Sequence, residues 1–154
     1  MIGWLVYDEV GANRNAWFID QLIWSASKHS TSLTLKIIST VEELYGQPLP
    51  DFAIVRTINP AVNKFLEANN VTCFNNHKTS KIANDKFATY NLCKQLNIDV
   101  LETQMASEAT LKLDFPLVLK SLNGHGGSEV FLATNKDEFD KIFSTANKNN
   151  FLAQ

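Results

Sequence analysis

The sequence predicts an α/β protein in which a small parallel sheet is followed by an α+β subdomain. Two observations support this prediction. Strand-like and helix-like segments alternate through residues 1–76, which is the rhythm of βαβ units and of a parallel sheet with helices on its faces. From residue 77 the alternation stops, and two apolar strand-like runs flank a glycine-rich segment, as in an antiparallel hairpin.

The first part reads as four strands and two long helices. A buried apolar run predicts the first strand, and apolar residues at helical spacing from Ala16 to Ala26 predict the first helix. Asn59 is a good N-cap, and Pro60 suits the first helical position, so the second helix begins there. In chain order the expected elements are strand 2–7, helix 15–28, strand 33–37, strand 52–55, helix 59–68 and strand 71–74.

The second part mixes helices with hairpin strands. Residues 78–96 read as helix, broken near Asn84-Asp85, with a stripe formed by Phe87, Tyr90, Cys93 and Leu96. Strands 117–120 and 130–133 follow, then a helix capped by Thr134 or Asn135, then a strand at 151–153. We therefore expect domains at 1–76 and 77–154. A strand so close to the last residue predicts the front part of a longer protein or a truncated product; the alternative is an edge strand that ends the domain.

Composition describes a globular chain with no strongly charged surface. Of its 154 residues, 45% are apolar and 19% charged, and the net charge is −2. There is no basic block and no apolar run of membrane-spanning length, so neither nucleic acid nor a membrane is expected as a partner. Cys73 and Cys93 lie in apolar settings and read as reduced core residues of a cytoplasmic protein.

The glycine-rich segment 124–128 is the strongest functional signal. Neither common phosphate-binding motif fits, because Ser128-Glu129 stands where a P-loop needs Lys-Ser/Thr and where a dinucleotide motif needs a third glycine. Bare backbone N–H groups of a hairpin flap can still approach phosphate oxygens closely. Lys120, at the end of the preceding strand, adds a compact positive charge suited to phosphate, which indicates ATP. An ordinary hairpin turn is the alternative.

Four other residues are weaker candidates. Lys86 follows Asn84-Asp85 at a helix start, where a lysine opposes the helix dipole, and His125 lies inside the flap. Arg56 follows a buried strand at the sheet edge where open parallel sheets bind ligands, so it could clamp a carboxylate. Asn13 follows the first strand and would lie at the same edge. Polar surface, loop or cap positions are the alternative for all four.

Taken in order, these features resemble the N-terminal part of ATP-grasp ligases, in the branch with ribosomal-protein and cofactor glutamate ligases and bacterial glutathione synthetases. The matching stretches are 51–56, 74–76, 84–89, 96–103, 115–120 with the flap, and 151–154. The resemblance implies a Rossmann-like pre-ATP-grasp domain followed by the first, incomplete ATP-grasp subdomain.

The resemblance also implies a reaction and a set of contacts. ATP phosphorylates a carboxylate, and an amine attacks the acyl phosphate. Lys86 and Lys120 match the lysines that contact the phosphates, and Gln154 matches the start of the strand that carries adenine contacts. The flap residues are Gly124, His125, Gly126, Gly127 and Ser128. Magnesium would neutralise the phosphates, but its ligands and the catalytic residues are expected beyond residue 154. We therefore expect these 154 residues alone to be inactive and to bind ATP weakly or not at all.

Two other function classes stay open on the sequence. One is a non-catalytic nucleotide- or ligand-binding domain that kept the fold. The other is a Rossmann-like ligand-binding domain in which the flap is only a hairpin. The acid and amine substrates, both expected to be small molecules, are not identified, and the oligomeric state is open, a homo-oligomer included.

Overall fold

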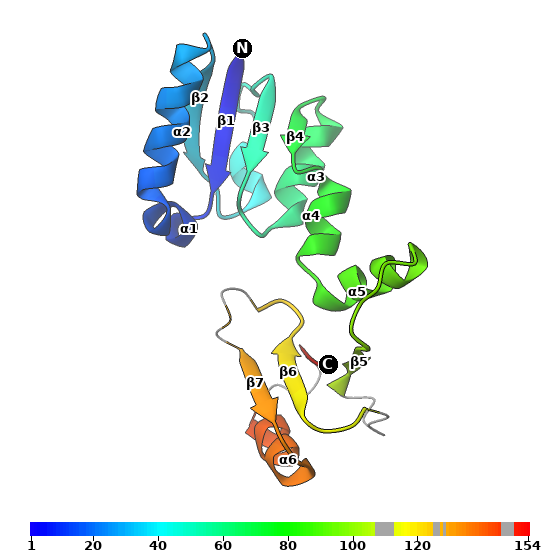
Figure 1. The fold of residues 1–154 in the computed structure, drawn as a ribbon. Helices are drawn as coiled ribbons and strands as arrows, with labels where there is room; N and C mark the ends of the chain where they lie inside the picture. Colours follow the sequence, from blue (N-terminus) through cyan, green and yellow to red (C-terminus); the bar gives the residue numbers. More distant parts are fainter. Residues whose placement is uncertain (107–112, 125–126, 128, 146–149) are drawn as a thin grey trace. The chain divides into compact units, whose positions relative to one another are not determined.

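The structure, a computed structural model, describes residues 1–106, 113–124, 127, 129–145 and 150–154 (Figure 1). The chain divides into two compact units, Met1–Lys81 and Ile82–Gln154, and each is described here by itself. Within the described residues, no helix is both long enough and apolar enough to cross a membrane.

The first unit is built on a four-stranded, all-parallel sheet. Its strands are β1 (Ile2–Tyr7), β2 (Ser32–Ile37), β3 (Phe52–Val55) and β4 (Thr72–Phe74). They lie in the order β2-β1-β3-β4. In the central strand, Leu5 pairs with Leu35 of β2 and with Ile54 of β3. The parallel sheet predicted from the alternation of residues 1–76 is therefore confirmed.

Helical segments of this unit are α1 (Glu9–Arg14), α2 (Ala16–Lys28), η1 (Val41–Leu44), α3 (Pro60–Ala68) and α4 (His77–Ala83), of which α4 runs past the end of the unit. The sequence reading missed α1 and η1. A side-chain cap explains α1, because Asp8 accepts a hydrogen bond from the Gly11 N–H at 2.7 Å. As predicted, Asn59 caps α3 and Pro60 is its first residue.

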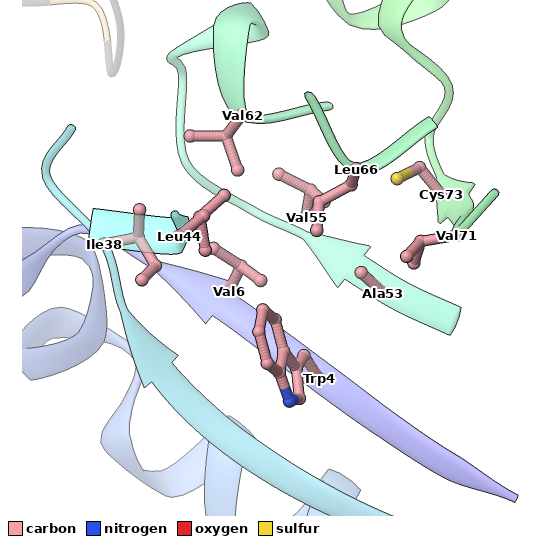
Figure 2. Packing of buried hydrophobic residues seen from close by; sticks show 10 residues of the cluster. All are labelled: Trp4, Val6, Ile38, Leu44, Ala53, Val55, Val62, Leu66, Val71 and Cys73. Atoms are coloured by element: carbon pink, nitrogen blue, oxygen red, sulfur yellow. The ribbon is translucent and has the colours of Figure 1, made fainter. Parts of the chain in front are cut away.

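Both faces of the parallel sheet are buried, as such sheets require. Alternate residues of β1 point to opposite faces. Trp4 and Val6 pack in one cluster with residues of β3, α3 and η1, and the ten side chains of this cluster fill the space between them (Figure 2). On the other face, Leu5 and Tyr7 pack with residues of α1, α2 and β2.

The second unit contains an antiparallel sheet in the order β5-β8-β6-β7. Its strands are β5 (Gln104–Met105), β6 (Leu117–Ser121), β7 (Val130–Ala133) and β8 (Phe151–Ala153), and its helices are α5 (Lys86–Gln95) and α6 (Lys136–Thr145). The predicted α+β character is confirmed, as is the break between α4 and α5. The two-residue strand β5 was missed, since it is too short to show a period.

Successive side chains of β6 point alternately into the core and to the opposite face of this sheet. Leu117 and Leu119 are fully buried in one cluster with Phe139 of α6. Val118 and Lys120 are only half-buried, as expected for the opposite face. On that face Lys120 pairs in register with Leu152 of β8, which brings the end of β6 beside the end of the chain.

Candidate functional site

A pocket of about 310 Å³ lies within the second unit. It is formed by one side of α5, by the segment before β5, and by the neighbouring strands β6 and β8. The lining residues are Ala83, Lys86, Thr89, Tyr90, Cys93, Val100, Thr103, Lys120, Leu152 and Gln154. The structure therefore brings Lys86, Lys120 and Gln154 together, although they are up to 68 positions apart in the sequence (154 − 86).

Lys120 reaches the pocket from the last part of β6. Its ammonium donates a hydrogen bond to the Gln154 side-chain oxygen. The Gln154 amide nitrogen in turn donates to the Thr103 hydroxyl at 3.1 Å, and that hydroxyl donates to the Leu101 carbonyl at 3.0 Å. A chain of hydrogen bonds thus fixes the amide orientation that presents an oxygen to Lys120. Thr103 is buried, and no sequence pattern indicated this role.

Lys86 reaches the pocket from the first residue of α5. Asp85 caps this helix by accepting from the Phe87 and Ala88 N–H groups, both at 2.9 Å. The Lys86 ammonium donates to three backbone carbonyls at the end of β6 and in the loop after it: Ser121 at 2.8 Å, Leu122 at 3.3 Å and Gly124 at 2.5 Å. A cap and a set of carbonyls therefore hold this cation in place.

The remaining helical wall comes from Thr89, Tyr90 and Cys93. With Lys86 they follow the i, i+3, i+4, i+7 pattern of one helix side. Tyr90 also donates from its hydroxyl to Glu102 at 2.9 Å, which ties α5 to the segment before β5. The sequence predicted one stripe made of Phe87, Tyr90, Cys93 and Leu96. Of these four residues, Tyr90 and Cys93 line the pocket, whereas Phe87 and Leu96 do not.

The ammonium groups of Lys86 and Lys120 give the pocket positive charge, and much of its wall is apolar. The described residues that line it include two lysines and one amide but no carboxylate. Such a site suits an anionic group attached to a flat or apolar body. It does not suit Mg²⁺, which needs oxygen ligands such as carboxylates. Among the described residues there is also no group of three or more His, Cys, Asp or Glu side chains that could hold a metal ion.

The glycine-rich segment joins β6 to β7. Gly127 has φ +77°, a left-handed conformation that glycine adopts without strain. Gly124 is crowded instead: a Cβ there would lie 2.0 Å from the Ser121 hydroxyl oxygen and 2.8 Å from a Glu129 carboxylate oxygen. The other predicted flap residues, His125, Gly126 and Ser128, lie outside the described residues.

Gly124→Ala is expected to destabilise the second unit by about 1–3 kcal/mol, because the new methyl group overlaps Ser121. The buried Ser121 hydroxyl oxygen has no hydrogen-bond partner among the described residues, so Ser121→Ala alone should change stability by less than about 0.5 kcal/mol. Adding Ser121→Ala to Gly124→Ala should recover part of the loss. Urea unfolding of the four proteins tests this, and no recovery would show that the overlap is not the cause.

The two substrate candidates lie in the first unit, and of the two only Asn13 lines the second pocket that the structure describes. Arg56 directly follows β3, is exposed, and donates its backbone N–H to the Val6 carbonyl at 2.8 Å. Asn13 lies in α1 and lines a second pocket, of about 390 Å³. Glu9 and Asp20 also line that pocket, and Arg56 does not. The expected cluster of the two residues at one site is therefore not seen in the lining of this pocket.

The two cysteines are free thiols in different surroundings. Cys73 is buried in the core of the first unit, with 8% of its surface exposed. Burial, and secondarily the negative charge of Glu67, raises the pKa of the Cys73 thiol to about 11. Cys93 is half-buried and lines the pocket of the second unit, so the expectation of a core residue holds for Cys73 only.

Sequence comparison identifies relatives for this chain. Residues 83–154 match the RimK-like ATP-grasp domain. A probable alpha-L-glutamate ligase of Mannheimia succiniciproducens is 31% identical over 108 residues, which cover 66% of this chain and 36% of that protein. The uncharacterized protein MG011 of Mycoplasma genitalium is 38% identical over 61 residues, covering 40% of this chain and 21% of that protein. The chain thus spans well under half of these relatives.

Solved structures share the fold over the whole chain. The RimK domain protein ATP-grasp from Sphaerobacter thermophilus superposes with a TM-score of 0.72 at 19% identity, covering 100% of this chain and 63% of that one. The D-alanine–D-alanine ligase of Bacillus anthracis gives a TM-score of 0.79 at 17% identity, covering 100% and 57%. The same ligase complexed with ATP gives 0.75 at 17% identity, covering 99% and 55%.

Proposed function

Because this chain resembles ATP-grasp ligases in sequence and in fold, as its sequence predicted, we propose that it is the nucleotide-gripping front part of an ATP-dependent carboxylate–amine ligase. One observation carries the proposal: Lys86, Lys120 and Gln154 line a single pocket inside the matched region 83–154. The resemblance to ATP-grasp ligases implies phosphate contacts for the two lysines and places Gln154 at the start of the strand that carries adenine contacts.

The residues present fit ATP. Lys86 and Lys120 supply two ammonium groups for phosphate oxygens, and such charge-assisted hydrogen bonds are the stronger kind. Gln154 marks the start of the strand to which we assign the adenine contacts, and Tyr90, Val100 and Leu152 supply apolar wall. The glycine-rich segment adds backbone N–H groups beside the phosphates. Bound ATP would supply the phosphoryl group that activates a carboxylate for attack by an amine.

We also propose a division of labour between the two parts of the chain. We assign residues 1–76 to a pre-ATP-grasp domain that helps to hold the substrate, with Arg56 and Asn13 as candidate contacts, and residues 77–154 to the first ATP-grasp subdomain. The described residues do not fit Mg²⁺. As the resemblance to ATP-grasp ligases implies, we assign the magnesium ligands and catalytic groups to later strands of the ligase fold, beyond residue 154. The small-molecule acid and amine and the oligomeric state are not specified by the proposal.

Protection of Cys93 from a thiol reagent tests the nucleotide site. Cys93 should react in the native chain, because it is half-buried in the pocket wall, whereas Cys73 should not. With its pKa raised to about 11, the Cys73 thiol has little thiolate at pH 8, and the fraction grows only as the pH rises toward that value. Millimolar ATP should slow Cys93 labelling, as followed by mass spectrometry.

Matched ligands and a variant serve as controls for this assay. Inorganic phosphate at the same ionic strength should protect much less than ATP, and Cys93→Ser should leave a native chain that does not label. Because these 154 residues alone are expected to bind ATP weakly or not at all, the deciding assay uses a longer chain that includes the rest of the ligase domain. Unchanged Cys93 labelling in that folded chain at ATP concentrations up to several millimolar would count against the proposed site.

A second candidate is equally compatible with the lack of a magnesium-type donor set among the described residues. In this alternative the chain is a non-catalytic nucleotide- or ligand-binding domain. Both candidates predict no turnover by these 154 residues alone, so ADP release with a panel of amino acids should stay at background. Robust ADP release would contradict the assignment of the catalytic groups to other parts of the protein.

A further inference from the structure

The Lys86 ammonium has no N–H to spare in this structure. A lysine ammonium carries three donors, and three carbonyl oxygens accept from Lys86, at 2.8, 3.3 and 2.5 Å. The backbone N–H of the same residue donates to the Leu122 carbonyl at 3.3 Å. The backbone N–H and the side-chain ammonium of Lys86 therefore both bind the chain where the glycine-rich segment begins.

Lys120 differs in this respect, although it lines the same pocket. Among the described residues, its ammonium has the Gln154 side-chain oxygen as its recorded acceptor. That oxygen belongs to a side chain, which Thr103 orients through the Gln154 amide nitrogen, whereas the acceptors of Lys86 are main-chain oxygens of Ser121, Leu122 and Gly124. The two cations of the pocket are therefore bound in unlike ways.

We propose that Lys86 is a positioning residue that anchors the segment 121–124 through its carbonyls, and that phosphate oxygens compete with these carbonyls for the same three N–H donors. The competition rests on the proposed nucleotide role of the pocket; the anchoring does not. Without a cation, three carbonyl oxygens directed at one point would repel each other and any phosphate nearby. Hydrogen bonds to a charged group are also among the stronger ones, so their loss should be measurable.

Hydrogen exchange without nucleotide tests the anchoring. The N–H groups of Ser121 and Leu122 are themselves hydrogen-bonded, to the Glu129 and Asn150 carbonyls at 3.2 and 2.8 Å, so their exchange reports local opening. In Lys86→Met this exchange should speed up about tenfold, which corresponds to the loss of about 1.4 kcal/mol. Lys120→Met is the matched control, since it removes the other pocket ammonium and keeps all three carbonyl contacts.

A second measurement covers the case in which Lys86→Met unfolds α5. In the wild-type chain, a slowly exchanging ¹⁵N ammonium signal should be observed by NMR for Lys86, assigned by its loss in Lys86→Arg, because all three of its hydrogens are bonded. ATP, but not adenosine, should shift this signal. Equal exchange at Ser121 and Leu122 in both lysine variants, or a Lys86 ammonium that exchanges as fast as that of an exposed lysine, would overturn the anchoring.

The anchoring role of Lys86 and the proposed nucleotide role can be disproved independently of each other. If ATP leaves the Lys86 signal unmoved and Cys93 unprotected while the exchange result holds, the nucleotide role is wrong and Lys86 is an anchor only. If ATP binds and shifts the signal but exchange does not depend on Lys86, the anchoring is wrong and the nucleotide role stands.

Discussion

Lys120→Met is expected to reduce ATP affinity by about 10- to 100-fold, which corresponds to the loss of about 1.5–3 kcal/mol from one hydrogen bond to a charged group. The substitution keeps much of the apolar stem and removes the ammonium that reaches the pocket from β6. The effect should appear as a loss of ATP protection at Cys93, at an ATP concentration that protects the wild-type chain. Adenosine, which lacks the phosphates, should act equally on both proteins.

Lys136→Met is the matched control for this prediction. Lys136 lies in the same unit, but it is exposed and pairs with Asp140 at 2.8 Å on the surface of α6. Removing that charge should leave ATP protection unchanged. If Lys120→Met retains full protection while the fold is intact, Lys120 is a structural strand-end residue and the phosphate role is wrong.

Leu66→Ala is expected to lower the free energy of unfolding of the first unit by about 2–5 kcal/mol. Leu66 has 0% of its surface exposed and packs in the core cluster with Val55, Val62 and Val71 (Figure 2). The truncated side chain leaves a cavity that surrounding helix and strands fill only in part. Since small domains are stable by only about 5–15 kcal/mol, this is a large fraction of the total.

Urea unfolding monitored by the accessibility of Cys73 suits this test, because Cys73 belongs to the same cluster. Val10→Ala serves as the comparison: Val10 lies in α1 of the same unit with 67% of its surface exposed, so the midpoint should barely move. A Leu66→Ala midpoint equal to that of Val10→Ala would show that this cluster does not stabilise the unit as its burial indicates.

Local signals in the sequence were sufficient for most of the elements. Asn59-Pro60 marked the start of α3, and Asn84-Asp85 marked the break before α5, because caps act within a few residues. Elements without a period were missed: α1 has six residues, η1 four and β5 two. The cap that explains α1, Asp8, is a typical N-cap residue, but a cap alone does not predict a helix when the six residues after it are too few to show a period.

The candidate site also has one part that could be predicted from the sequence and another part that could not. Lys120 could be placed beside a glycine-rich hairpin, because alternation along a strand fixes its face. The parts that Thr103, Tyr90 and Cys93 play in the pocket could not be predicted, since they depend on how α5 and the segment before β5 pack against the sheet. Nor could the sequence show that Asn13 shares its pocket with two acidic residues.

By itself, the sequence determined that this is a parallel-sheet α/β unit followed by an α+β unit, and that lysines and glycines are available for a phosphate. Only the tertiary structure decided which groups meet. Pairing of β6 with β8 sets Lys120 opposite Leu152 and beside Gln154, and the turn after β6 directs three carbonyls to Lys86. The reason is physical: short-range propensity acts over a few residues, whereas these contacts join positions that are 32 to 38 residues apart.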